Sequence, residues 1–234
     1  AVRADPYPVY RWFREHDPVH RLEPRQPGGV VRYLLTRWDD VEAGLKHPLL
    51  KRTEHTNALW NQPIDQVPPA FVTYAKITRA WPLFRDPPEH AALRRPINRV
   101  LEGSDRQSDE LIQHFVHETL EELSQVEQFD LVEDLARRVL LKFNLAALGI
   151  QGGAIGELSG HLANVTQALG NVFDAARIET ASRSMDVLTE WIGNAAARHR
   201  GSPGGEAAPF LEQLLGLEKA GAIQGAEQVA ATAI

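Results

Sequence analysis

The chain has 234 residues, of which 43% are hydrophobic and 24% are charged, a composition typical of a globular protein with a sizeable core. Its net charge of −6 argues against a nucleic-acid or anionic-membrane surface. It has no cysteine, which excludes disulfides and thiolate ligands or nucleophiles within this sequence. No apolar run reaches the roughly 18 residues of a membrane span, and no signal-peptide layout opens the chain, so we expect a cytoplasmic protein.

The pattern of the first fifty residues predicts a helix, two strands and a second helix. A helix opens at Pro6, and its apolar residues repeat at helical spacing. Residues 18–37 predict two strands joined by a Pro-Gly-Gly turn at 27–29. Residues 38–48 predict a short helix that the proline at its end closes.

Residues 51–85 have no clear hydrophobic period, although they contain several aromatic side chains and prolines. A loop of this length inside a compact domain tends to be functional. We expect residues 56–85 and the connection near 174–176 to be the most mobile internal regions. The rest of the chain is helical in pattern. The segment from Asp130, a candidate cap, to Gly149 is apolar on several sides, so we expect it to be central. The other expected helices span about 105–124, 157–173, 176–200, 207–219 and 226 onward.

The last seven residues, QVAATAI, read as an apolar helix start. A buried helix that ended here would leave carbonyl groups and apolar surface without partners. We therefore expect either a truncated chain or a partner that completes the fold, with loose packing over residues 207–234. No domain boundary is visible, so residues 1–234 are interpreted as a single, incomplete domain.

Residues 84–101, FRDPPEHAALRRPINRVL, start a helix with an unusual set of basic side chains. Asp86 is placed as the N-cap, Pro87 at the first helical position, and Glu89 three residues after the cap, which is a capping-box arrangement. The pattern therefore predicts a well-specified helix start.

Two pairs of basic residues lie four apart on this helix. His90 and Arg94 share one face, and Arg95 and Arg99 share another, rotated by about 100°. Paired donors near a helix N-terminus suit an anion, and a planar guanidinium suits a carboxylate. The alternative is a surface helix whose arginines are simply solvated.

The stretch RDPPEHAALRR (85–95) resembles the helix C signature of bacterial cytochrome P450 haem-thiolate monooxygenases, D-P-P-E-H-x-x-x-R. Further segments resemble that family in the same order, including DPYPVYRWFREHDPVH, FDLVEDLARRVLLKFNLAALGI and GAIQGAEQV. The resemblance covers the whole chain but only the N-terminal half of the family's fold, from helix A to the start of helix I. It implies a mainly α fold with a small β-sheet.

The resemblance implies that His90 and Arg94 contact the propionates of a haem cofactor. It also implies that Arg95 and Arg99 face a ferredoxin-type electron donor. The family's iron-ligating cysteine, its acid–threonine pair and its Glu-x-x-Arg pair are all absent, so no catalytic residue is assigned. His114 and His117 are three residues apart, but nothing completes a metal site, and no metal ligand is assigned. The chain alone is expected to be inactive and to bind haem only with a cysteine-bearing C-terminal part.

The family holds its substrate between helices B and C and under helices F and G, which correspond here to about 56–85 and 157–190. Candidate wall residues in these segments are apolar, which implies an apolar small-molecule substrate. Any one of these residues, taken alone, is more often an ordinary residue of the hydrophobic core than part of a binding site. They are Trp60, Phe71, Val72, Leu169, Val172 and Phe173.

Three interpretations follow. The first is the N-terminal part of a cytochrome P450 monooxygenase, of a kind used in secondary metabolism, that inserts oxygen into an apolar small molecule. The second is a natural half-length, haem-less relative that acts as an auxiliary or binding partner. The third is a helical small-molecule binder without a catalytic relative, which the contiguous motif disfavours. None of them involves nucleic acid or a membrane.

Overall fold

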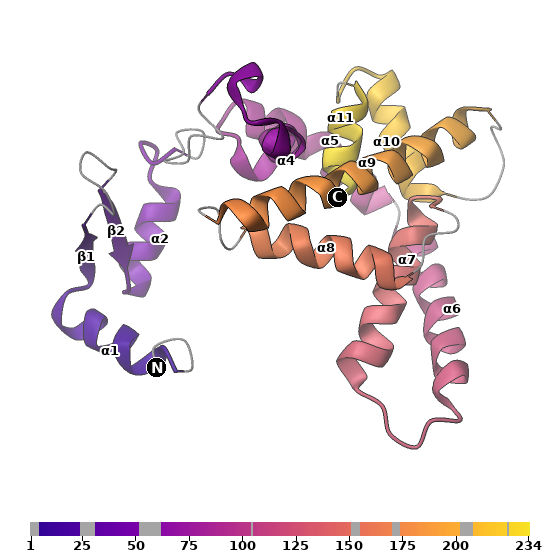
Figure 1. Cartoon of the computed structure of the whole chain (residues 1–234), viewed down its shortest axis with the longest axis horizontal. Helices are drawn as coiled ribbons and strands as arrows, with labels where there is room; N and C mark the ends of the chain where they lie inside the picture. Colours follow the sequence, from indigo (N-terminus) through magenta and orange to yellow (C-terminus); the bar gives the residue numbers. More distant parts are fainter. Residues whose placement is uncertain are drawn as a thin grey trace. The chain divides into compact units, whose positions relative to one another are not determined.

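The computed structural model describes residues 5–23, 31–51, 62–103, 105–150, 155–169, 174–201, 208–223 and 225–234. These residues are mainly helical and contain one two-stranded sheet, as the sequence predicts (Figure 1). They cluster into two compact units, Ala1–Thr56 and Asn57–Ile234. The single domain expected from the sequence stays a prediction.

The first unit contains α1 (Tyr7–His16), β1 (Val19–Leu22), β2 (Arg32–Leu35) and α2 (Trp38–Lys46). The strands pair antiparallel, with Val19 opposite Leu35 and Leu22 opposite Arg32. The order helix, strand, strand, helix agrees with the prediction, while the expected turn at 27–29 lies outside the described residues. None of the described side chains of this unit is fully buried, and an isolated two-stranded hairpin is marginally stable.

The second unit is a set of helices arranged around α9. Helices α8 and α9 lie side by side along much of their length, and α6 and α7 form a hairpin (Figure 1). The helices are α4 (Val72–Ala80), α5 (Glu89–Gly103), α6 (Asp105–Leu123), the π-helical η4 (Leu131–Ala136), α7 (Arg137–Ala147), α8 (Ile155–Leu169), α9 (Ala175–Gly201), α10 (Pro209–Lys219) and α11 (Gly225–Ala233). Three single-turn 3₁₀ helices are η1 (Ile64–Gln66), η2 (Pro69–Phe71) and η3 (Pro82–Phe84).

Helix α9, and not the segment 130–149, is the central element. Nine residues of α9 are buried, including Met185, which is 0% exposed. By contrast, Val132 and Leu140 of η4 and α7 are 62% and 57% exposed. The expected central position of 130–149 is therefore wrong. The segment has the apolar faces that the sequence predicts, but one of these faces is exposed to solvent.

Residues 62–84 are more ordered than the sequence indicates. They form η1, η2, α4 and η3, and four residues of α4 are buried, among them Tyr74 and Ile77. A helix of nine residues is too short to be stable by propensity alone, so its contacts with α9 and α11 must stabilise it. The expectation of a structureless 51–85 segment is wrong for these residues, while residues 52–61 lie outside the described part.

The apolar end of the chain is also packed. Val229, Ala230 and Ala231 of α11 are 3%, 1% and 4% exposed, and α11 contacts α4, α9 and α10. The small alanine side chains let α11 approach its neighbours closely. The expectation that this stretch leaves its apolar surface uncovered is wrong for these three residues. The loose packing expected for 207–234 stays a prediction that hydrogen exchange can test.

The helical segment η4–α7 begins and ends where the sequence predicts. The Asp130 carboxylate accepts hydrogen bonds from the backbone N–H groups of Val132 and Glu133, both at 2.8 Å, at the start of η4. After α7, Gly149 takes a left-handed φ of +61°. The N–H of Gly149 donates to the carbonyl of Ala146 at 3.0 Å, and the next N–H donates to the carbonyl of residue 145 at 2.9 Å. This pair of bonds is a Schellman motif, in which glycine avoids the strain of its conformation.

A partly buried cation joins α6 to α7. The Nζ atom of Lys142 lies 3.1 Å from a Glu118 oxygen and 2.8 Å from a Glu122 oxygen, and the Lys142 side chain is only 11% exposed. Desolvation acts to lower the pKa of Lys142, but its bonds to Glu122 and Glu118 outweigh it and raise that pKa. Lys142 therefore stays charged where it holds the hairpin together.

Candidate functional site

The basic helix α5 begins later than the capping-box pattern predicts. Its first residue is Glu89, and residues 87–88 form the turn before it. The carboxylate of Glu89 pairs with the Arg85 guanidinium at 3.1 Å, although the sequence pattern places it as the partner of the cap. The carbonyl of Asp86 still accepts from the N–H of His90 at 2.9 Å, which continues the helical bonding back to the predicted cap residue.

The four predicted donors of α5 have no partner within the described part of the chain. Among the described residues, the side chains of His90, Arg94, Arg95 and Arg99 make no hydrogen bond or ion pair. His90 is half-buried, whereas the three arginines are exposed. Most other described arginines bind an acid or a carbonyl group. These are Arg21, Arg37, Arg79, Arg85, Arg137, Arg138, Arg177, Arg183, Arg198 and Arg200.

The predicted apolar wall is placed only in part. Phe71 and Val72 are half-buried and pack against the main core at the start of α4. Leu169 is half-buried at the last residue of α8. Trp60, Val172 and Phe173 lie outside the described residues. Their role in binding a substrate stays a prediction.

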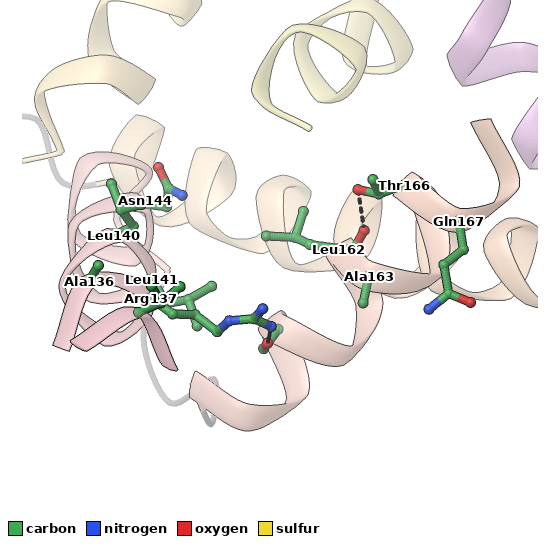
Figure 2. Close-up of a pocket in the computed structure, with 11 residues that line it drawn as sticks. Ala136, Arg137, Leu140, Leu141, Asn144, Leu162, Ala163, Thr166 and Gln167 are labelled. Atoms are coloured by element: carbon green, nitrogen blue, oxygen red, sulfur yellow. Dashed lines mark hydrogen bonds between the residues drawn. The ribbon is translucent and has the colours of Figure 1, made fainter. Parts of the chain in front are cut away.

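A surface groove that the sequence did not indicate runs between η4–α7 and α8 (Figure 2). Its volume is about 560 Å³, within the range of small-ligand sites. Val132, Ala136 and Leu140 line it at intervals of four residues, a spacing visible in the sequence but not evidence of a groove by itself. Leu162, Ala163 and Thr166 form much of the α8 wall.

The polar groups of this groove are mostly satisfied by the protein. At one end, Arg137 reaches from α7 to the Ser159 hydroxyl at 3.3 Å and also pairs with Glu133 at 2.9 Å. On the α8 wall, the Thr166 hydroxyl donates to the Leu162 carbonyl at 2.9 Å, the dashed line in Figure 2. The surface that the groove offers to a ligand is therefore largely aliphatic.

The described part of the chain offers neither a metal site nor a membrane span. It contains no group of three or more His, Asp or Glu side chains that could hold a metal ion. The Nδ1 atom of His117 instead lies 3.1 Å from the Gln113 carbonyl, one turn earlier on α6. Among the described helices, none combines the length and the apolar character that crossing a bilayer requires.

The helical arrangement is that of the N-terminal half of the cytochrome P450 fold, and the α5 motif is similar to the one at the same place in that fold. No family model matches the chain. Among curated proteins it is similar to cytochrome P450 130 of Mycobacterium tuberculosis, with 27% identity over 137 residues, or 56% of this chain and 31% of the relative. The match thus spans about a third of that relative's length.

Solved structures match the chain over nearly its whole length. CalO2 is 26% identical with a TM-score of 0.71, and the match covers 99% of this chain and 55% of that one. P450BioI, solved with an acyl carrier protein ligated to hexadec-9Z-enoic acid, is 14% identical with a TM-score of 0.75 over 99% and 57% of the two chains. Epothilone D-bound cytochrome P450epoK is 21% identical with a TM-score of 0.68 over 100% and 56%. The chain therefore spans little more than half of these structures.

Proposed function

We propose that this chain forms the haem-contacting and substrate-covering part of a cytoplasmic, haem-dependent monooxygenase that inserts oxygen into an apolar small molecule. The observation that carries the proposal is a pair of donors on one face of α5, His90 and Arg94, that bind no other described residue. Most other arginines of the described chain already have partners, so these side chains remain available for an external anion.

The residues present fit the propionates of a haem but not its iron. A carboxylate is a suitable partner for an unpaired guanidinium, and a charge-assisted hydrogen bond contributes roughly 1.5–3 kcal/mol. The chain has no cysteine, so a thiolate ligand must come from another stretch of polypeptide. A thiolate-bound haem supplies the oxygen-activating chemistry. His90 and Arg94 would hold its acidic edge and fix its orientation.

The second basic face of α5 suits a different partner. Arg95 and Arg99 are exposed and unpaired in the described structure, and they would meet an acidic, ferredoxin-type electron donor. Charge pairs of this kind mainly speed association, and salt screens them. Electron delivery should therefore fall with ionic strength and with loss of either arginine.

The substrate is proposed to be apolar because the candidate wall offers few polar groups. Phe71, Val72 and Leu169 would contribute to this wall, together with Trp60, Val172 and Phe173. Concave, mostly apolar surfaces with a few polar groups are typical of small-molecule sites.

The test compares the two faces of α5 in the chain joined to a cysteine-bearing C-terminal part. Arg94→Ala should weaken haem retention about tenfold or more, because one charge-assisted bond is lost. His90→Ala should cost less, since a neutral imidazole forms a weaker bond. Arg95→Ala is the matched control and should leave haem content unchanged while slowing ferredoxin-driven turnover. Haem loss in Arg95→Ala together with full retention in Arg94→Ala would assign the two faces the other way round.

The alternative is a natural haem-less protein that acts with a partner. The burial of Val229, Ala230 and Ala231 favours it, because α11 completes a packed core within the second unit. Hydrogen exchange on the isolated chain separates the two proposals. Strong protection across 208–234 supports a self-sufficient unit, whereas rapid exchange there supports dependence on further polypeptide.

A further inference from the structure

Helix α4 lacks a cap from its own sequence. The residue before its first turn is Phe71, whose side chain cannot accept a hydrogen bond, and no side-chain cap bond forms there. The first four N–H groups of any helix need partners from outside the helical bonding pattern. A short helix with an uncapped start would fray at the end that carries Phe71 and Val72.

Helix α9 supplies a partner for one of these N–H groups and a second bond beside it. The backbone N–H of Tyr74 donates to the Ser182 hydroxyl at 3.3 Å, and the Thr73 hydroxyl donates to the Asp186 carboxylate at 2.6 Å. Ser182 is only 3% exposed, so its bond is shielded from water. Ser182 and Asp186 are four residues apart and therefore lie on one face of α9. The Asp186 carboxylate also lies at the positive end of the α4 dipole, which favours a negative charge.

We propose that Ser182, which caps the Tyr74 N–H, and Asp186, which holds the Thr73 side chain, together form a cap supplied by another helix and are positioning residues for the substrate wall. They fix the start of α4, and with it Phe71 and Val72, to α9. The link between this cap and substrate binding rests on the function proposed above, whereas the cap itself does not.

The cap and the core have separate effects on α4. Tyr74 and Ile77 are 0% and 1% exposed, so apolar burial keeps the helix against its neighbours even without the cap. The two bonds from α9 act only at its N-terminal turn. Loss of the cap should therefore loosen residues 69–74 while the second half of α4 stays protected. A displacement of α9 should carry the start of α4 with it.

The experiment measures amide hydrogen exchange in the full chain. Ser182→Ala, Asp186→Ala and Thr73→Val should each speed exchange over residues 69–74 by about five- to tenfold, the effect of losing one net hydrogen bond. Thr73→Ser keeps the hydroxyl and should restore the parent rate. Glu190→Ala, which removes an exposed carboxylate one turn further along α9, is the matched control and should change nothing.

A second readout is binding of the apolar dye Nile red, which tests the substrate wall. Weaker Nile red binding in the cap variants, with recovery in Thr73→Ser, supports the positioning role. Faster exchange with unchanged dye binding supports the cap but overturns its role in the substrate wall, and so counts against the proposed pocket. Unchanged exchange in Ser182→Ala and Asp186→Ala, or an equal change in Glu190→Ala, overturns the cap itself.

Discussion

Replacing Gly149 by alanine should destabilise the protein through two separable effects. At a φ of +61°, an L side chain costs about 1–2 kcal/mol. In addition, a Cβ atom at this position would lie 2.8 Å from the Cβ of Ala208, which is itself only 3% exposed. Relieving such an overlap in a packed region costs about 1–3 kcal/mol. The free energy of unfolding should therefore fall by about 2–5 kcal/mol.

Two other glycines of the chain provide matched controls. Gly221 also has a positive φ, +72°, but a Cβ there meets nothing within 4 Å, so Gly221→Ala should cost only about 1–2 kcal/mol. Gly193 lies inside α9 with open space around it. Gly193→Ala should stabilise the protein by about 0.5–1 kcal/mol, since alanine suits a helix better.

Urea unfolding followed by circular dichroism measures the three variants. The expected order of stability is Gly193→Ala above the parent, then Gly221→Ala, then Gly149→Ala. Equal losses for Gly149→Ala and Gly221→Ala would show that the approach of Ala208 contributes nothing. A Gly149→Ala protein as stable as the parent would refute the reasoning on both effects.

Three further predictions concern buried and capping groups. Burial raises the pKa of Tyr74 to about 12, above its unfolded value near 10, so the stability that Tyr74 contributes is present below pH 10 and lost as pH rises toward 12. Tyr74→Phe should therefore lose less stability than the parent over that interval, as measured by urea unfolding at each pH. Hydrogen bonds from the backbone N–H groups of Glu133 and Val132 lower the pKa of Asp130, so its contribution is present above about pH 4 and lost as pH falls. Asp130→Ala should be less stable than the parent at pH 7, and the gap should narrow below pH 4. Leu211 is 0% exposed, and Leu211→Ala should lower the free energy of unfolding by about 2–5 kcal/mol, with no change expected if the side chain were exposed.

The parts of the fold that depend on local chemistry were predictable from the sequence. Asp130 at the start of η4 and Gly149 after α7 act through neighbouring backbone groups, and the structure confirms both. Helix α4 is not predictable from the sequence, because nine residues give too weak a periodic signal and its stability comes from contacts with α9 and α11. The position of 130–149 is not predictable from the sequence, because an apolar face indicates that burial is favourable but not which neighbour covers it.

The candidate site also has local features that the sequence predicts and tertiary features that it does not. The spacing of His90 and Arg94 along one helix is a local property, so their common face could be predicted. That they lack acidic partners among the described residues depends on every other element of the unit, and only the structure shows it. The groove between α7 and α8 depends on how two helices separated by residues 148–154 face each other, and no pattern within either helix determines that.

The pairing of Lys142 with Glu118 and Glu122 has a consequence for chemical labelling. Amine-directed acylating reagents attack only the neutral form of a lysine that they can reach. Lys142 is 11% exposed with a raised pKa, whereas the Lys46 side chain is 73% exposed. Lys46 should therefore be modified early, and Lys142 only when the α6–α7 hairpin opens. The rate at which Lys142 is acylated, followed by mass spectrometry, would thus report how readily this hairpin opens, without any engineered probe.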